Sequence, residues 1–427
     1  MKSHSDYSEQ GNLITRAVNQ IKNKIIYKGG IIMSMKKFTK KMLAIVAAAA
    51  MTMGMAMPAM AAEGTTVPDT KNNAKEAYIS KTYNTEVKKP MKFNFTATQV
   101  KEGAYIVTDD VACTIPSIEF TETDLNSNKG TYKKLSDKIT FAIFPQAGKY
   151  EYTVRESATT EPAITNSKHQ KLIMSQAEYK MDVYVVENAG TLAIDKIIVN
   201  KTKDDNNGSA TGKVDIGGDV NGNGFNFVNT YVQEAGTGTD PTNPGTDPDD
   251  DYTKYGSLNV SKTIDAQAGT VDSDAEFTFT AKFEFPKGTD AETLEAKAGD
   301  ATLTLDENNQ HTFTLKHGQN MKYTGLPVGT KITVTETGVA NYKGSVSVVL
   351  NGGTATTDTA AKYHADFEAV KDGKLGQQKN TVDVTNTYNY VPTTGIIMNT
   401  LPYVLMVALC AVALFGFVAF KRKKVQK

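Results

Sequence analysis

Short runs of alternating apolar and polar residues fill most of the chain between residues 63 and 390. Thr, Val, Tyr and Phe dominate these runs, and Gly, Asn and Asp separate them. Examples are Lys92–Phe95, Tyr150–Val154 and Phe277–Thr280. A period of two predicts half-buried strands, and frequent turn residues are typical of β-sandwiches rather than of alternating α/β units. Only Ala291–Ala298 is expected to form a short helix.

A segment without an apolar face interrupts the strand pattern at residues 233–253. It is rich in Pro, Gly, Thr and Asp, which is typical of a linker. The linker separates two predicted sandwiches, residues 63–232 and 254–390. The expected fold is therefore all-β, with two tandem domains.

The two halves repeat each other at three places, in the same order. The matched segments are Ile79–Thr82 with Val260–Thr263, Tyr152–Glu156 with Ile332–Glu336, and Phe227–Tyr231 with Val384–Tyr388. Each half thus carries a Lys, a Glu and an Asn: Lys81, Glu156 and Asn229 in the first, and Lys262, Glu336 and Asn386 in the second. Because side chains alternate faces along a strand, all six polar residues fall on the apolar face of their strands.

A buried lysine and glutamate are costly unless they are paired or neutralised. One interpretation is a buried ion pair in each domain, with the asparagine as a hydrogen-bond partner. The other is a reaction among the three residues. Desolvation lowers the pKa of a lysine and raises that of a glutamate. The neutral amine then attacks the asparagine side-chain carbonyl, while the carboxyl polarises its oxygen and shuttles protons. Ammonia leaves, and an isopeptide bond remains.

The N-terminal region carries an export pattern. Basic residues at Lys36–Lys41 precede the apolar run Met42–Met60, which leads into a small-residue cleavage pattern. We expect signal-peptide cleavage at Ala61 and Ala62, so that residues 1–61 form a leader. Met35 is the expected true start.

The C-terminal region, residues 391–427, carries an anchoring pattern. The apolar run Ile396–Phe420 contains no charge, and the basic residues Lys421–Lys424 follow it directly. Such a run is long enough to span a bilayer, and the basic tail predicts a C-terminus on the inner side.

The formal net charge of zero hides an acidic body. Outside the two terminal segments, the chain holds 33 basic and 45 acidic residues, which argues against nucleic acid as a partner. The five histidines are scattered, and no phosphate-binding loop or Cys/His cluster is present, so we expect no metal, no cofactor and no turnover enzyme. Cys410 lies in the apolar span and leaves Cys113 as the single cysteine of the body, so no disulfide is expected there.

Several motifs together resemble one family over residues 63–427. The triads, the run F-T-L-K-H-G-Q at Phe313–Gln319, the run L-P-V-G-T at Leu326–Thr330 and the tail are similar to the major pilins of Gram-positive bacteria, of the streptococcal T-antigen type. The resemblance implies immunoglobulin-like (CnaB-type) domains, each with a Lys–Asn isopeptide bond assisted by a Glu. The implied bonds are Lys81–Asn229 with Glu156, and Lys262–Asn386 with Glu336. Asn226 and Asn389 are neighbouring alternatives, but both have the wrong parity.

The same resemblance makes the tail a sortase sorting signal, with Val391, Pro392, Thr393, Thr394 and Gly395 as the recognition motif. Valine replaces the usual leucine at its first position. A class C, pilin-polymerising sortase is implied to cut between Thr394 and Gly395. The Thr394 carbonyl then passes to a lysine of another copy, or a housekeeping sortase passes it to peptidoglycan.

Polymerisation needs an acceptor lysine in the first domain, and the common Y-P-K-N motif is absent. By its position shortly before the last strand, Lys213 is the implied acceptor, with Lys201 and Lys203 as rivals.

The resulting hypothesis is a backbone pilin of a pilus attached covalently to the cell wall, retained briefly in the membrane before sorting. Its implied partners are other copies of the chain and minor pilins or a tip adhesin. The alternative is a monomeric wall-anchored surface protein or adhesin. A surface enzyme built on sandwich domains is the third class, and the sequence offers no site for it.

Overall fold

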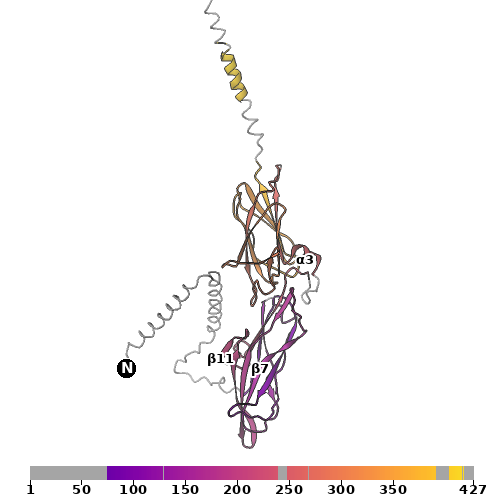
Figure 1. Cartoon of the computed structure of the whole chain (residues 1–427), viewed down its shortest axis with the longest axis vertical. Helices are drawn as coiled ribbons and strands as arrows, with labels where there is room; N and C mark the ends of the chain where they lie inside the picture. The colour runs from indigo at the N-terminus through magenta and orange to yellow at the C-terminus, as the bar shows by residue number, and fades with distance from the viewer. Residues whose placement is uncertain are drawn as a thin grey trace, which may run out of the picture. The chain divides into compact units, whose positions relative to one another are not determined.

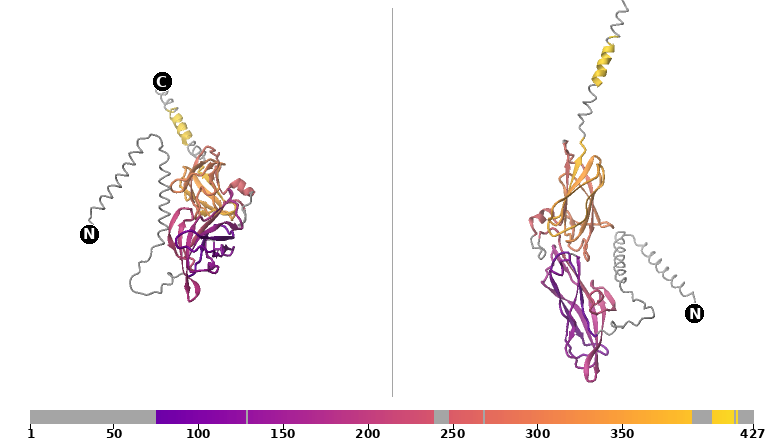
Figure 2. Two further views of the ribbon diagram at one scale, coloured as in Figure 1. Left: turned by 60° about the horizontal axis from the view of Figure 1, so that its bottom comes forward. Right: turned by 180° about the vertical axis from the view of Figure 1, so that it is seen from behind.

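Strands dominate the part of the chain that the structure describes. The computed structural model describes residues 75–127, 129–238, 248–267, 269–390, 403–415 and 417. Two compact units divide the chain, Met1–Pro68 and Asp69–Lys427, and every described residue belongs to the second. Its strands gather in two bodies, coloured indigo to magenta and orange in Figure 1, and Figure 2 shows the same two groups from other directions. The all-β architecture predicted from the alternating pattern is confirmed.

The first body is a sandwich of a four-stranded sheet, ordered β5-β1-β12-β8, and a six-stranded sheet, ordered β11-β10-β9-β7-β2-β4. Its strands are β1 (Ser80–Asn84), β2 (Met91–Val100), β3 (Cys113–Thr114), β4 (Ile118–Phe120), β5 (Thr131–Leu135), β6 (Thr140–Phe141), β7 (Gly148–Glu161), β8 (Gln170–Ile173), β9 (Glu178–Asn188), β10 (Thr191–Lys203), β11 (Ser209–Val214) and β12 (Asn226–Gln233). Strands β3 and β6 form a separate two-stranded sheet. Aromatic side chains join the two sheets: the ring centroids of Phe95 on β2 and Phe227 on β12 lie 5.2 Å apart.

The second body pairs a seven-stranded sheet, ordered β16-β15-β18-β13-β23-β20-β21, with a four-stranded sheet, ordered β17-β14-β19-β22. Its strands are β13 (Leu258–Asp265), β14 (Phe277–Glu284), β15 (Lys297–Ala298), β16 (Ala301–Thr302), β17 (Gln310–Leu315), β18 (Asn320–Thr324), β19 (Lys331–Glu336), β20 (Tyr342–Val349), β21 (Thr356–Thr359), β22 (Phe367–Lys374) and β23 (Thr381–Tyr388). Phe283 on β14 crosses to Tyr323 on β18, with 5.3 Å between ring centroids.

The first and last strands of each sandwich are neighbours and run parallel. On β1 and β12, Lys81 is paired with Phe227, two residues before Asn229. On β13 and β23, Lys262 is paired with Val384, two residues before Asn386. Residues two apart on a strand share a face, so each lysine and its asparagine point into the same core with the same offset.

All six polar residues predicted to face the cores do so. Lys81 and Asn229 are 0% exposed, and Lys262, Glu336 and Asn386 are at most 3% exposed. The side chain of Glu156 is also 0% exposed, although its main chain lies partly at the surface. The parity argument is therefore confirmed at each position.

The predicted linker contains a short helix that the sequence pattern did not indicate. Helix α3 (Asp250–Tyr255) begins after Asp249, whose side chain accepts a hydrogen bond from the Tyr252 backbone N–H, and ends at Gly256. The Tyr252 hydroxyl donates to the buried carboxylate of Glu234 over 2.8 Å. Tyr252 thus links this acidic stretch to a buried hydrogen-bond acceptor.

The helix predicted at Ala291–Ala298 is wrong. Residues 291–295 form turns, and Lys297 and Ala298 belong to strand β15. Glu295 has a φ of 54°, which ends any right-handed helical turn. The backbone of Gly325 also packs here, because a Cβ on it would lie 2.5 Å from the Leu294 carbonyl oxygen. Tertiary packing therefore overrides the local helix propensity.

The C-terminal region is described only in part. Residues 403–415 and 417 are helical, and no helix among the described residues is long and apolar enough to cross a membrane. The remaining residues of the predicted span, and the basic tail, lie outside the described residues.

Candidate functional site

Three strands bring the first triad together inside the first sandwich. Strand β7 lies in the six-stranded sheet and directs Glu156 across the core toward β1 and β12 in the opposite sheet. The Lys81 Nζ atom lies 2.8 Å from Glu156 Oε1 and 2.9 Å from Oε2. Asn229 Nδ2 donates to Glu156 Oε1 over 2.8 Å. One carboxyl group therefore contacts both the amine and the amide.

The amide of Asn229 has a defined orientation. The backbone N–H of Ser175 donates to Asn229 Oδ1 over 2.8 Å, and an N–H group can only donate, so the oxygen must face it. The Nδ2 atom faces Glu156 and also lies 3.3 Å from the Met174 Sδ atom. This geometry differs from the expectation that the carboxyl polarises the carbonyl oxygen, because Glu156 contacts the amide nitrogen instead.

The second sandwich repeats the arrangement. Lys262 Nζ lies 2.8 Å from Glu336 Oε1, and Asn386 Nδ2 donates to the same oxygen over 2.8 Å. Lys262 and Glu336 are close enough for an ion pair, but the angles of the contact do not fit a hydrogen bond. The Lys262 Nζ atom therefore has no hydrogen-bond partner among the described residues. Its charge instead faces the ring of Phe277, 4.0 Å from the centroid.

A glycine makes room for the second triad. Gly344 on β20 is paired with Asn386, and a Cβ on it would lie 3.2 Å from Glu336 Oε2 and 2.8 Å from the Phe367 ring. Any larger residue would press on the carboxyl or on the ring. The Asn386 Oδ1 atom is buried and has no hydrogen-bond partner among the described residues.

Burial shifts both kinds of charged group toward neutrality. Desolvation lowers the pKa of Lys81 to about 8, against the opposing attraction of Glu156. The same cause lowers the pKa of Lys262 to about 8. Burial raises the pKa of Glu156 and of Glu336 above the ordinary value, although the neighbouring lysine in each site opposes the shift. A proton shared between amine and carboxyl can therefore leave a neutral amine beside a protonated acid.

The two alternative asparagines point away from the triads. Asn226 Oδ1 accepts hydrogen bonds from the hydroxyls of Ser80 and Thr82, at 3.1 and 2.9 Å. Asn389 is exposed beyond the end of β23. Neither lies beside a lysine–glutamate pair.

A cavity of about 290 Å³ lies beside the first triad. Glu156, Met174 and Ser175 line it together with Lys203 at the end of β10 and Asn207 in the β10–β11 connection. Met174 thus contacts both the cavity and the Asn229 amide nitrogen.

The three candidate acceptor lysines differ in their surroundings. Lys201 Nζ forms an ion pair with Asp205 at 3.0 Å and lies 5.4 Å from the centroid of the Tyr179 ring. Lys203 Nζ lies 3.7 Å from Glu178. Lys213 is exposed on the edge strand β11 and makes no ion pair within the described part of the chain.

Ala61, Ala62 and the motif Val391–Gly395 lie outside the described residues. In the part of the chain that the structure describes, no group of three or more His, Cys, Asp or Glu side chains could hold a metal ion.

Two residues at the first site had no signal in the sequence. Ser175 lies in the β8–β9 connection, and Asp205 lies in the β10–β11 connection. Neither falls in an alternating run, so strand parity does not apply to them. The stretch Asp204–Gly208 indicates a turn, but not what the turn contacts.

Two pilus proteins of Streptococcus pyogenes are similar in sequence to parts of this chain. A pilin of Streptococcus pyogenes serotype M1 is 28% identical over 172 residues, which are 39% of this chain and 48% of the pilin. The chain is similar to streptococcal pilins. The pilus tip adhesin Cpa of Streptococcus pyogenes is 33% identical over 141 residues, 33% of this chain and 18% of the adhesin. The matches thus span less than half of each relative's length.

Two further comparisons concern domains and structures. The family described as Domain of unknown function (DUF7601) matches residues 256–388, which make up the second sandwich. The crystal structure of the major pilin from Streptococcus pyogenes aligns with 73% of this chain and 98% of its own, at 18% identity and a TM-score of 0.29.

Proposed function

We propose that this chain is a structural pilus subunit in which each sandwich is closed by a self-formed Lys–Asn isopeptide bond. The observation that carries the proposal is the duplicated buried triad, in which one carboxyl contacts both an amine and an amide. A buried ion pair alone would not need an asparagine at the same offset in both cores. The similarity to a pilin and to a pilus adhesin supports the same conclusion.

The reaction would begin with transfer of a proton from the lysine ammonium to the glutamate, favoured by the opposite pKa shifts. The neutral Nζ atom of Lys81 attacks the Cγ atom of Asn229, and a tetrahedral intermediate forms. The protonated Glu156 then delivers its proton to Nδ2, which its carboxyl already contacts, and the resulting carboxylate takes one of the two protons left on Nζ. The Cγ–Nδ2 bond breaks, ammonia leaves, and the Nζ–Cγ amide bond remains. The second site follows the same steps with Lys262, Glu336 and Asn386.

The bonds would serve a mechanical purpose. Each joins parallel neighbouring strands at the beginning and end of a sandwich. Tension that enters at the C-terminal end of β23 passes from Asn386 directly to Lys262. The residues between them carry no load, so the second sandwich does not need to unfold under force. The described cysteines are both free, which leaves these bonds as the covalent reinforcement that we propose.

Export, sorting and polymerisation complete the proposal. Val391–Gly395 with the following apolar and basic residues forms the sorting signal, and sortases would join Thr394 to another copy or to peptidoglycan. We assign Lys213 as the acceptor because it is exposed on an edge strand, whereas Lys201 and Lys203 lie near carboxylates. The protein would act at the cell surface with other pilins.

The mass of the purified full chain tests the cross-links. It is expected to fall short of the mass of the same sequence without bonds by two ammonia molecules. Glu156→Ala and Glu336→Ala should each restore one ammonia mass, because the proton carrier of one site is lost. Asn226→Ala serves as the matched control and should keep the full deficit. A wild-type mass equal to the plain sequence would overturn the proposal.

Ladder formation with a pilin-polymerising sortase tests the acceptor. Lys213→Ala is expected to abolish the detergent-resistant ladder of high-mass products, because no amine remains to resolve the thioester. Lys201→Ala and Lys203→Ala are the matched controls and should polymerise normally. A ladder from the Lys213 variant would reject this assignment.

The second candidate function is a monomeric wall-anchored adhesin. The similarity of one third of the chain to a tip adhesin favours it. It predicts a single wall-linked band in boiled wall extracts, where a shaft subunit gives a ladder.

A further inference from the structure

The two triads differ in the surroundings of the amide oxygen. In the first, the backbone N–H of Ser175 donates to Asn229 Oδ1 over 2.8 Å. In the second, Asn386 Oδ1 has no hydrogen-bond partner among the described residues. The oxygen gains negative charge when the amine adds to the carbonyl carbon, and a donor aimed at it stabilises that charge. The first site alone has such a donor in the described structure.

Strand pairing explains the difference. Strand β23 is paired on both sides around Asn386, with β13 and with β20. Strand β12 is paired with β8 only from Thr230 onward, so the edge of β12 before Thr230 lies beside loops instead. Ser175 comes from one of these loops, which follows β8.

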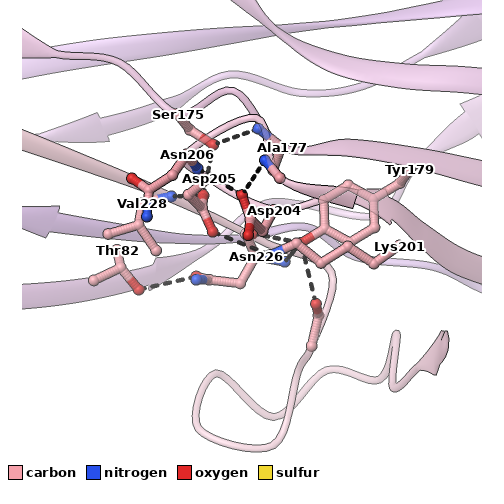
Figure 3. A network of polar contacts seen from close by, with 12 residues as sticks. Thr82, Ser175, Ala177, Tyr179, Lys201, Asp204, Asp205, Asn206, Asn226 and Val228 are labelled. Atoms are coloured by element: carbon pink, nitrogen blue, oxygen red, sulfur yellow. Dashed lines mark hydrogen bonds and ion pairs between the residues drawn. The ribbon is translucent and has the colours of Figure 1, made fainter. Parts of the chain in front are cut away.

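A carboxylate holds this loop in place, as Figure 3 shows. Asp205 Oδ1 accepts the Ser175 hydroxyl at 2.6 Å and the Val228 backbone N–H at 2.8 Å. Its main-chain oxygen accepts the Gln176 backbone N–H at 3.0 Å. Asp205 therefore contacts Ser175, the residue after it, and Val228, the residue before Asn229. It fixes the donor and the acceptor of the Ser175–Asn229 hydrogen bond relative to each other.

We propose that the Ser175 N–H forms an oxyanion-stabilising element of the first cross-linking reaction, and that Asp205 is the positioning residue that holds it there. This inference rests on the proposed isopeptide chemistry. Asp205 touches neither reacting group by a hydrogen bond, so its action is indirect. The second site lacks this element, and the two bonds consequently depend on different residues.

The charge of Asp205 acts in a second way. Burial is the main cause that raises the pKa of Glu156, and Asp205 adds to it as a smaller electrostatic effect. Lys201 binds Asp205 Oδ2 at 3.0 Å and offsets part of that charge. The positioning role and the charge effect predict different results for Asp205→Asn, which keeps an acceptor oxygen and loses the charge.

The rates of the two bonds in one molecule give the test. The full chain is synthesised in a cell-free reaction, quenched at intervals, digested, and scored by mass spectrometry for the Lys81–Asn229 and Lys262–Asn386 peptides. The second bond serves as an internal clock. Asp205→Ala is expected to slow the first bond about 10- to 100-fold relative to the second, which is less than the roughly 100- to 1000-fold loss when an oxyanion donor itself is removed, because the Ser175 N–H is still present.

Three further variants separate the possible causes. In Asp205→Asn, the ratio of the rates of the two bonds should stay within about threefold of wild type, because the amide oxygen of the new side chain still accepts from Ser175 and Val228. Lys201→Met removes the ion pair with Asp205 and the charge near the Tyr179 ring, and should leave the ratio unchanged. Ser175→Ala keeps the Asp205 carboxylate and removes the hydroxyl that donates to it and that accepts from the Ala177 backbone N–H. It should slow the first bond several-fold even if Asp205→Ala folds poorly.

An unchanged ratio in Asp205→Ala or in Ser175→Ala would overturn the inference. So would equal slowing in Asp205→Ala and Asp205→Asn, because charge would then be the cause, or equal slowing in Lys201→Met. Absence of both bonds in the wild-type chain would instead refute the proposed function itself.

Discussion

Replacing Asn229 with alanine is expected to lower the free energy of unfolding of the first sandwich by about 5 kcal/mol. The bond between residues 81 and 229 closes a loop of well over 100 residues, and the loop-entropy relation for cross-links gives a stabilisation of about 5 kcal/mol for such a loop. In the variant, Lys81 stays a free amine and forms the ion pair with Glu156 that the uncross-linked side chains make, so no isolated charge adds to the loss. For a domain of this size the midpoint of thermal unfolding should fall by about 10–20 °C. Calorimetry measures it directly.

The matched control for this change lies three residues away on the same strand. Asn226→Ala removes the hydrogen bonds from the Ser80 and Thr82 hydroxyls and leaves the triad intact. It should cost about 1–2 kcal/mol. The transition of the second sandwich should stay in place in both variants. If the Asn229 and Asn226 variants unfold at the same temperature, no covalent bond closes the first sandwich.

The arrangement of the triads could be predicted because it depends on strand parity. Lys81, Glu156 and Asn229 occupy positions in alternating runs, and alternation determines the face of a side chain directly. The repeat of the same order around Lys262 then supported each position independently. The fold class followed from the same pattern, since strands with one apolar face must pack against another sheet.

The residues around the triads could not be predicted, for physical reasons. Ser175 and Asp205 act from loops, where the backbone conformation depends on tertiary contacts rather than on a local period. The backbone N–H of Ser175, in such a loop, turns Asn229 Oδ1 away from Glu156. The Glu156 carboxyl therefore contacts Nδ2, whereas the sequence predicted a contact with the amide oxygen. The false helix at Ala291–Ala298 has the same origin, because Gly325 packs against its backbone.

Replacing Asn386 with alanine is expected to make the second sandwich gain stability at alkaline pH, which the wild-type chain should not do. Without its target amide, Lys262 stays a free amine with a folded-state pKa of about 8, below the ordinary value of 10.5. Between these pH values the unfolded chain binds more protons than the folded one, so stability rises with pH. A shift of this size corresponds to about 3 kcal/mol.

The wild-type chain should lack this gain because the bond turns the Lys262 amine into an amide that does not titrate. Glu336 does not reproduce it, because burial raises its pKa, and a raised carboxyl pKa makes stability fall as pH increases. Denaturant unfolding between pH 7 and pH 10.5 measures the free energy of unfolding of the variant and of the wild-type chain. In the difference between the two free energies, the titration of groups common to both chains cancels. Asn389→Ala, at the exposed end of the same segment, should behave like wild type. An alkaline gain of equal size in the wild-type chain would mean that Lys262 still titrates there, and that the second bond does not form.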